Sequence, residues 1–114
     1  MTFTGSCHCG EVRYEVEGEL GRVMECNCSH CSRKGYLLWF LPRAQMKFIA
    51  GGDKLATYLF NKHVIRHQFC PTCGCAPLAF GERAGAEMVA VNVRCLEGVD
   101  IATLERQPVD GRSL

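Results

Sequence analysis

The 114-residue sequence has no excess of charge of either sign and no long apolar run. Thirteen basic residues stand against twelve acidic ones, and the formal net charge is +1. This balance argues against broad electrostatic attraction to nucleic acid or to an anionic membrane, so we expect neither as a partner. The longest apolar run, residues 36–42, is too short to cross a bilayer. No basic segment followed by an apolar run opens the chain as in a secretory signal, so we expect a cytoplasmic protein.

Cysteine, by contrast, is abundant, with nine residues in the chain. The cytoplasm keeps thiols reduced, and clustered cysteines in that compartment are more typical of metal binding than of disulfides. The count is also odd, which a framework built of disulfides alone would not predict. We therefore interpret most of the cysteines as metal ligands, with disulfides as the disfavoured alternative.

Short apolar segments separated by turn residues predict a mainly β fold. Val12, Tyr14 and Val16 alternate with charged residues, as in a strand with one buried face. Further strands are predicted at residues 38–41, 46–50, 55–60, 64–69, 77–80 and 87–93, the last with Val89, Val91 and Val93 on one face. Residues 51–54, Gly-Gly-Asp-Lys, predict a hairpin turn between the strands that flank them.

Two short helical turns are also expected. Ser29 is a candidate cap for a turn that runs through Lys34 and ends at Gly35, and Asp100 is a candidate cap for residues 101–106. We expect one domain over residues 1–106 and a short, loosely held tail over residues 107–114. The predicted architecture is several small antiparallel sheets with metal-binding turns between them.

The motif C-P-T-C-G, from Cys70 to Gly74, is the strongest metal-binding signal. Two residues between the cysteines let one tight turn aim both sulfurs at a single ion, and Pro71 and Gly74 favour such a turn. A redox dithiol is the alternative interpretation. It requires a βαβ setting, which the surrounding pattern does not predict.

Two C-x-C motifs, Cys7 with Cys9 and Cys26 with Cys28, place further conditions on the backbone. Residues i and i+2 of a flat strand lie about 6.6 Å apart. Two sulfurs on one zinc ion lie about 3.8 Å apart. Each motif must therefore lie on a bent or turning segment, as the glycine after Cys9 suggests.

Seven of the cysteines divide into a group of four and a group of three. The four form a closed, structural zinc site: Cys7, Cys9, Cys70 and Cys73. The three form a second site: Cys26, Cys28 and Cys31. Because zinc in proteins is usually tetrahedral, the second site keeps one position open, which is typical of catalytic zinc.

Four stretches of the chain resemble the glutathione-dependent formaldehyde-activating enzyme (GFA) family: GSCHCGEVRYEVEG (5–18), CNCSHCSRKG (26–35), FCPTCGCAPL (69–78) and VNVRCLEGVD (91–100). The resemblance covers nearly the whole chain and implies a β-tent-like zinc-binding fold. It also implies that the group of four holds a structural zinc ion. The other group, Cys26, Cys28 and Cys31, would then hold a second, catalytic zinc ion.

The resemblance implies a carbon–sulfur lyase reaction run in reverse, since the namesake enzymes join glutathione to formaldehyde and form S-hydroxymethylglutathione. The expected partners are a small-molecule thiol and an aldehyde, and the expected cofactor is zinc, at two ions per chain. A thiol bound at the open position would lose its proton and attack the aldehyde. The namesake enzymes are longer, and their inserted segments have no counterpart here. The resemblance to the family therefore supports the two metal sites more directly than it supports a glutathione-binding pocket.

Further residues are candidates for roles near the second site. Its fourth ligand is sought among Cys95 and the four histidines: His8, His30, His63 and His67. Cys75 is interpreted as a spare thiol near the closed site. Arg33 and Lys34 are either solvated charges or partners of a substrate carboxylate. Five aromatic residues are expected in the core: Trp39, Phe40, Tyr58, Phe60 and Phe69. For Trp39 and Phe40 the alternative interpretation is that their side chains line a pocket beside the open zinc position.

Three other functions are weighed against the enzyme. A non-catalytic zinc module that binds another protein is the main alternative. A thiol reductase with Cys95 as nucleophile is suggested only by a faint resemblance to the methionine sulfoxide reductase B family. A zinc ribbon that binds nucleic acid is disfavoured by the near-neutral charge.

Overall fold

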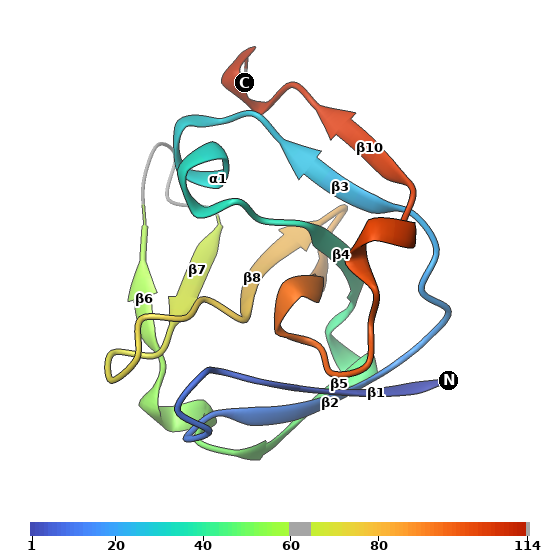
Figure 1. Ribbon diagram of the computed structural model, residues 1–114. Coiled ribbons are helices and arrows are strands. Elements are labelled where there is room, and N and C mark those ends of the chain that lie inside the picture. Colours follow the sequence, from blue (N-terminus) through green and yellow to red (C-terminus); the bar gives the residue numbers. More distant parts are fainter. Residues whose placement is uncertain (60–64, 114) are drawn as a thin grey trace.

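A computed structural model describes residues 1–59 and 65–113 and contains two β-sheets, one short helix and several 3₁₀ turns (Figure 1). The strands are β1 (Thr2–Ser6), β2 (Arg13–Glu17), β3 (Val23–Cys26), β4 (Leu38–Pro42), β5 (Met46–Ala50), β6 (Ala56–Tyr58), β7 (Arg66–Phe69), β8 (Leu78–Arg83), β9 (Ala86–Asn92) and β10 (Arg106–Val109). The helix is α1 (Ser29–Lys34). The prediction of a mainly β fold is confirmed. Phe60 and His63 lie outside the described residues.

The two sheets differ in size. The first contains three strands in the order β1-β2-β5, and the second contains seven in the order β10-β3-β4-β9-β8-β7-β6. Neighbouring strands are antiparallel except β10 and β3, which run parallel. In Figure 1 the first sheet lies at the bottom of the view, and α1 lies near the top, directly after β3.

The main hydrophobic core is built largely from the alternating residues of β2 and β9. Tyr14 and Val16 of β2 are fully buried, and so are Val89 and Val91 of β9. Trp39 of β4 joins this core and meets the ring of Phe3 edge-on, with the ring centroids 5.5 Å apart. The core interpretation of Trp39 is therefore confirmed.

Two of the other predicted core aromatics lie at the surface. Phe40 is 40% exposed and Tyr58 is 48% exposed. Phe40 follows Trp39 on β4, so its side chain points to the opposite face of the sheet. Tyr58 lies on β6, the last strand of the second sheet, where one side has no neighbouring strand. Phe69 is partly buried and packs against a second, smaller core cluster.

The predicted hairpin around residues 51–54 is wrong. β5 pairs with β2 in the first sheet, whereas β6 pairs with β7 in the second. The turn residues, Gly52–Lys54, form a 3₁₀ turn that carries the chain from one sheet to the other. β5 pairs with β2 because this pairing places Met46, the buried residue of β5, beside Val16 of β2 in the main core.

The predicted loose tail from residue 107 is also wrong for residues 107–109. These residues belong to β10, which pairs in parallel with β3 over its whole length. The preceding helical turn spans only Ile101–Thr103, capped by the Asp100 carboxylate, which accepts a hydrogen bond from the N–H of Ala102 at 3.1 Å. Pro108 is compatible with β10 because an edge strand leaves one row of backbone groups without ladder partners.

Within the described part of the chain, the structure contains no helix with the length and apolar character needed to cross a membrane.

Core truncation tests this packing. Val91→Ala removes two methyl groups from a fully buried position of β9, and we expect it to lower the free energy of unfolding by about 1–3 kcal/mol. Ile49→Ala, at a position that is 52% exposed, is the control and should cost less than about 0.5 kcal/mol. Urea unfolding followed by Trp39 fluorescence measures both values. Equal losses in the two variants would contradict this assignment of the core.

Candidate metal centres

The connection between β1 and β2 turns the first two cysteines toward each other. The N–H of Cys7 donates to the carbonyl of Val12 at 3.1 Å, and the N–H of Gly10 donates to the carbonyl of Cys7 at 3.3 Å. Gly10 has a φ of 82°, a value that favours glycine. This tight turn brings the Cys7 and Cys9 sulfurs to 3.5 Å from each other. The predicted bend at the first C-x-C motif is therefore confirmed.

The connection between β7 and β8 forms a similar turn around Cys70. The N–H of Gly74 donates to the carbonyl of Cys70 at 2.7 Å, and the N–H of Cys70 donates to the carbonyl of Cys75 at 2.9 Å. Gly74 has a φ of 82°, the same left-handed conformation as the glycine of the first turn. The turn therefore presents both sulfurs of the C-P-T-C-G motif on one side.

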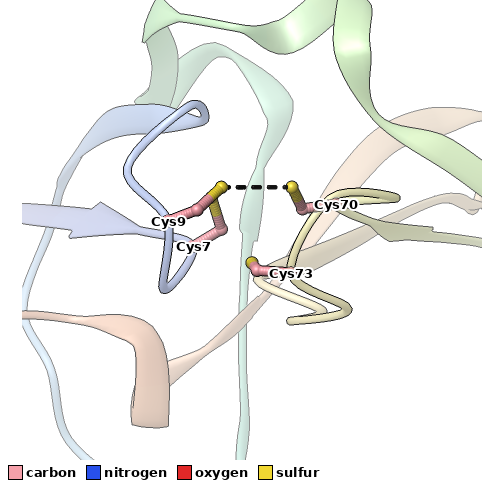
Figure 2. Close-up of side chains that lie close together, drawn as sticks. All are labelled: Cys7, Cys9, Cys70 and Cys73. Carbon is pink, nitrogen blue, oxygen red and sulfur yellow. Dashed lines mark hydrogen bonds between the residues drawn. The ribbon is translucent and has the colours of Figure 1, made fainter.

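The first turn connects strands of the first sheet and the second turn connects strands of the second sheet. The two turns face each other, and their four sulfurs point into one space (Figure 2). The ligand atoms all lie within 4.8 Å of one another, with 3.7 Å between the sulfurs of Cys9 and Cys70. Cys7 and Cys70 are buried, whereas Cys9 is exposed. This four-cysteine cluster, which consists of Cys7, Cys9, Cys70 and Cys73, could hold a metal ion.

Backbone donors favour the ionised form of sulfur in this cluster. The N–H groups of Cys75 and Cys9 donate to the Cys73 sulfur and lower the pKa of that thiol to about 6. The N–H of Val12 donates to the Cys7 sulfur at 3.4 Å. Thiolates that receive N–H hydrogen bonds suit a soft or borderline cation such as Zn²⁺, so the donor set fits this metal.

The second group of cysteines lies where β3 ends and α1 begins. Cys26 is the last residue of β3, Cys28 is the N-cap of α1 and Cys31 is the buried residue of the helix. Their sulfurs also lie within 4.8 Å of one another. The prediction of Ser29 as the cap is wrong, because the Cys28 sulfur accepts the N–H of Cys31 at 3.3 Å. Gly35 ends the helix with a φ of 70°, as predicted.

This three-cysteine cluster, which consists of Cys26, Cys28 and Cys31, also has the properties of a cation site. The N–H of Cys28 donates to the Cys26 sulfur at 3.5 Å. Burial raises the pKa of the Cys31 thiol, and the neighbouring Cys28 and Cys26 raise it further. Three thiolates this close therefore require a positive charge between them to stay ionised together.

The residues that follow β10 cover one side of the three-cysteine cluster. The Asn27 side chain donates to the Asp110 carboxylate at 2.9 Å and accepts the N–H of Arg112 at 2.9 Å. The backbone N–H of Asn27 donates to the carbonyl of Val109 at 3.0 Å. Gly111 lies so close that a Cβ at this position would stand 2.3 Å from the Cys26 sulfur. The sequence pattern around Gly111 does not predict this contact.

Comparison with known proteins identifies the family. The sequence model described as glutathione-dependent formaldehyde-activating enzyme matches residues 2–108. The chain belongs to this GFA family. A Rhodobacter sphaeroides protein of known crystal structure, a structural genomics target, has 31% sequence identity to this GFA-family chain. The two structures match with a TM-score of 0.79. The match covers 91% of the chain described here and 99% of that protein. The resemblance inferred from the motifs is therefore confirmed.

The other candidate ligands of this GFA-family chain lie elsewhere. The group of metal-ligating atoms around Cys31 includes neither Cys95 nor His8, His30 or His67, and His63 lies outside the described residues. Burial raises the pKa of Cys95 to about 11, and the charges of Cys75, Cys7 and Cys73 raise it further. Within the described part of the chain, the second cluster therefore consists of three cysteines that could hold a metal ion.

A cavity of about 270 Å³ lies between α1 and strands β6 and β7. Its lining includes His30 and Lys34 of α1, Tyr36, Tyr58 and His67. The ring centroids of His30 and His67 are 4.3 Å apart, and those of His30 and Tyr58 are 5.2 Å apart. A larger hollow of about 710 Å³ is lined by residues of β1, β2 and β5 and contains no cysteine. No cysteine lines the smaller cavity either, but two of its lining residues, Tyr36 and Phe69, pack with Cys31 in the smaller core cluster. The smaller cavity therefore shares neighbours with the three-cysteine cluster.

Substituting Gly111 tests the contact between the C-terminal segment and Cys26. We expect Gly111→Ala to push this segment away, because the added carbon has no space beside the sulfur. The amide protons of Asn27 and Arg112 would then exchange on the order of tenfold faster as their hydrogen bonds weaken. Gly21→Ala, where the added carbon meets nothing within 4 Å, is the control. NMR measures these amide exchange rates. Unchanged rates for Asn27 and Arg112 in Gly111→Ala would exclude the close contact between Gly111 and Cys26.

His67 provides a test by pH. Burial lowers the pKa of His67 from 6.5 to about 4, with smaller effects from His30 and Lys34. Between these two values the unfolded chain binds a proton that the folded chain does not. The free energy of unfolding therefore falls by an amount on the order of 3 kcal/mol as the pH drops from about 6.5 to 4.

NMR titration of the His67 ring resonances measures this pKa directly. We expect nearly constant shifts from pH 7 to pH 5 and a midpoint near 4. A midpoint near 6.5 would mean that the ring is hydrated rather than enclosed by its neighbours.

Proposed function

We propose that the chain is a zinc-dependent enzyme of the carbon–sulfur lyase type that adds glutathione or a similar thiol to formaldehyde or another small aldehyde. The observation that carries this proposal is the three-cysteine cluster. Its three sulfurs gather at one point, and the described residues place no fourth ligand atom beside them. Membership of the GFA family supports the reaction type.

We propose zinc at both clusters, two ions per chain. The four-cysteine cluster is closed by protein ligands and is the structural site, where metal binding contributes folding free energy directly. The three-cysteine cluster is the catalytic site: Cys26, Cys28 and Cys31 are the ligands. Zinc bound there supplies a positive centre that favours the thiolate form of an incoming thiol.

The reaction requires no oxidant or reductant. The S–H bond of the thiol breaks, and a C–S bond forms to the carbonyl carbon. The π pair of the carbonyl becomes a lone pair on oxygen, and this oxygen takes up a proton. The protein has to hold the thiol sulfur and the carbonyl carbon in contact and to limit the access of water.

The arrangement of the cluster supports this division of roles. The C-terminal segment covers the side of Cys26, where Gly111 leaves no space for a further atom. Cys31, the most buried of the three cysteines, packs with Tyr36 in the smaller core cluster. Tyr36 also lines the cavity beside α1, so approach of substrate from that side is consistent with the packing. We propose a cytoplasmic location, because clustered cysteines that bind metal require a compartment that keeps them reduced.

Comparing two cysteine variants tests the proposal. Zinc content is measured on the purified protein, and adduct formation from glutathione and formaldehyde is followed by exchange NMR against the spontaneous rate. We expect about two zinc ions per chain and clear acceleration in the unaltered protein. Cys28→Ser removes one ligand of the three-cysteine cluster and should retain one ion and lose the acceleration.

Cys75→Ser is the matched control, because Cys75 belongs to neither cluster. It should keep both the zinc content and the acceleration. Equal acceleration in the unaltered protein and in Cys28→Ser would refute the catalytic role of the cluster. Two bound zinc ions without any acceleration would instead indicate a non-catalytic zinc module.

A further inference from the structure

We propose that the cavity between α1 and strands β6 and β7 binds a planar carbonyl compound that carries an anionic group, and that this compound is the electrophile of the reaction. The inference rests on the proposed function, since it names the class of the aldehyde. It makes formaldehyde a minimal substrate rather than the one that the site is shaped for. The size, the walls and the charge of the cavity support this assignment, and two of its lining residues, Tyr36 and Phe69, pack with Cys31.

The size of the cavity suits a ligand larger than formaldehyde and smaller than glutathione. Its volume is about 270 Å³. A water-sized group occupies about 30 Å³ of liquid, so the space corresponds to about nine such groups. Formaldehyde would leave most of it unfilled, whereas drug-sized and peptide ligands need about 300–1,000 Å³. A single ring with one or two small substituents matches the volume.

The walls suit a flat ligand. The rings of Tyr36 and His67 are nearly parallel, with an interplanar angle of 11° and centroids 5.9 Å apart. The rings of His30 and Tyr58 are also stacked, with an interplanar angle of 28°. Phe69 adds another ring to the lining. These rings pack against one another, with the His30 and His67 centroids 4.3 Å apart. The surface that such a ring cluster presents to the cavity binds planar groups through offset stacking and edge contacts.

The charge of the cavity suits an anion. Lys34, the last residue of α1, is the charged side chain among the described residues that line the cavity. Its ammonium group lies 5.9 Å from the centroid of the Phe69 ring, over the ring and within the lining of the cavity. A carboxylate on the ligand would form a charge-assisted hydrogen bond with it. Arg33 and Lys34 are both exposed. Arg33 does not line the cavity and donates instead to the carbonyl of Ser29 at 2.9 Å.

The cavity and the three-cysteine cluster share structural elements. His30 stands one residue before Cys31 on α1, and Tyr36 packs with Cys31 in the smaller core cluster. An occupant held at one end by Lys34 would therefore lie beside the helix that contains Cys31. This position makes it the electrophile, because the incoming thiol is expected at the sulfurs.

The experiment compares two probes that differ by one charged group, 4-carboxybenzaldehyde and benzaldehyde. Binding is measured by NMR titration of the zinc-loaded protein, with the ring resonances of Tyr36, Tyr58 and His67 as reporters. The rate of adduct formation with glutathione is measured for both probes and for formaldehyde. Lys34→Met removes the charge in the cavity. Arg33→Met removes a charge from the same helix outside the cavity and is the matched control.

We expect 4-carboxybenzaldehyde to shift the reporter resonances and to bind about fivefold more tightly than benzaldehyde. Lys34→Met should abolish that difference, and Arg33→Met should preserve it. The acceleration of adduct formation should follow the same order. Equal binding of both probes to the unaltered protein would overturn the proposal. Equal effects of the two variants would overturn it too.

The design separates this inference from the proposed function. If formaldehyde is accelerated and neither aromatic probe binds, the inference is wrong and the proposed function stands. If 4-carboxybenzaldehyde binds through Lys34 but no aldehyde reacts faster than spontaneously, the proposed function is wrong. In that case the role of electrophile is overturned together with it.

Discussion

The meeting of four sulfur atoms is the constraint on which the rest of the structure depends. Cys9 and Cys70 are 61 residues apart in the sequence, yet their sulfurs lie 3.7 Å apart. One belongs to the turn between β1 and β2 of the first sheet, and the other to the turn between β7 and β8 of the second. Thiolates so close together repel one another unless protons or a cation balance their charge. Whatever balances that charge also joins the two sheets.

The two cysteine clusters differ in how the chain surrounds them. The four-cysteine cluster lies at the edge of the main core, with two buried cysteines and two turns of similar geometry. The three-cysteine cluster lies at the junction of a strand and a helix of only six residues. Its covering segment is held largely by hydrogen bonds to a single side chain, that of Asn27. The first arrangement is suited to stability and the second to exchange of a ligand.

Local patterns in the sequence predicted the parts of the fold that depend on local physics. Alternation of apolar and charged residues located β2 and β9, and the spacing of the cysteines indicated the turns that present the sulfurs. The Schellman-type end of α1 at Gly35 followed from the need for a left-handed residue. Each of these features is determined within about ten neighbouring residues.

The features that the sequence did not predict depend on contacts between distant segments. The Gly-Gly turn at residues 51–52 has good hairpin chemistry, but the partner of β5 is decided by packing against the core. β10 carries a proline and polar residues, and only its place beside β3 makes it a strand. The cavity combines rings from α1, β6 and β7, none of which is distinctive in its own segment. The roles assigned to the cysteines as zinc ligands stay predictions, since the geometry is compatible with metal but does not identify it.

The parallel pairing of β10 with β3 also has a consequence for the order of events during synthesis. Asp110, which anchors the covering segment, follows Asn27 by 83 residues. At translation rates of about 5–20 residues per second, several seconds separate the appearance of the two. Throughout that interval the sulfurs of Cys26, Cys28 and Cys31 have no covering segment. These sulfurs are therefore accessible from that side during synthesis, and this access ends when the last strand takes its place beside β3.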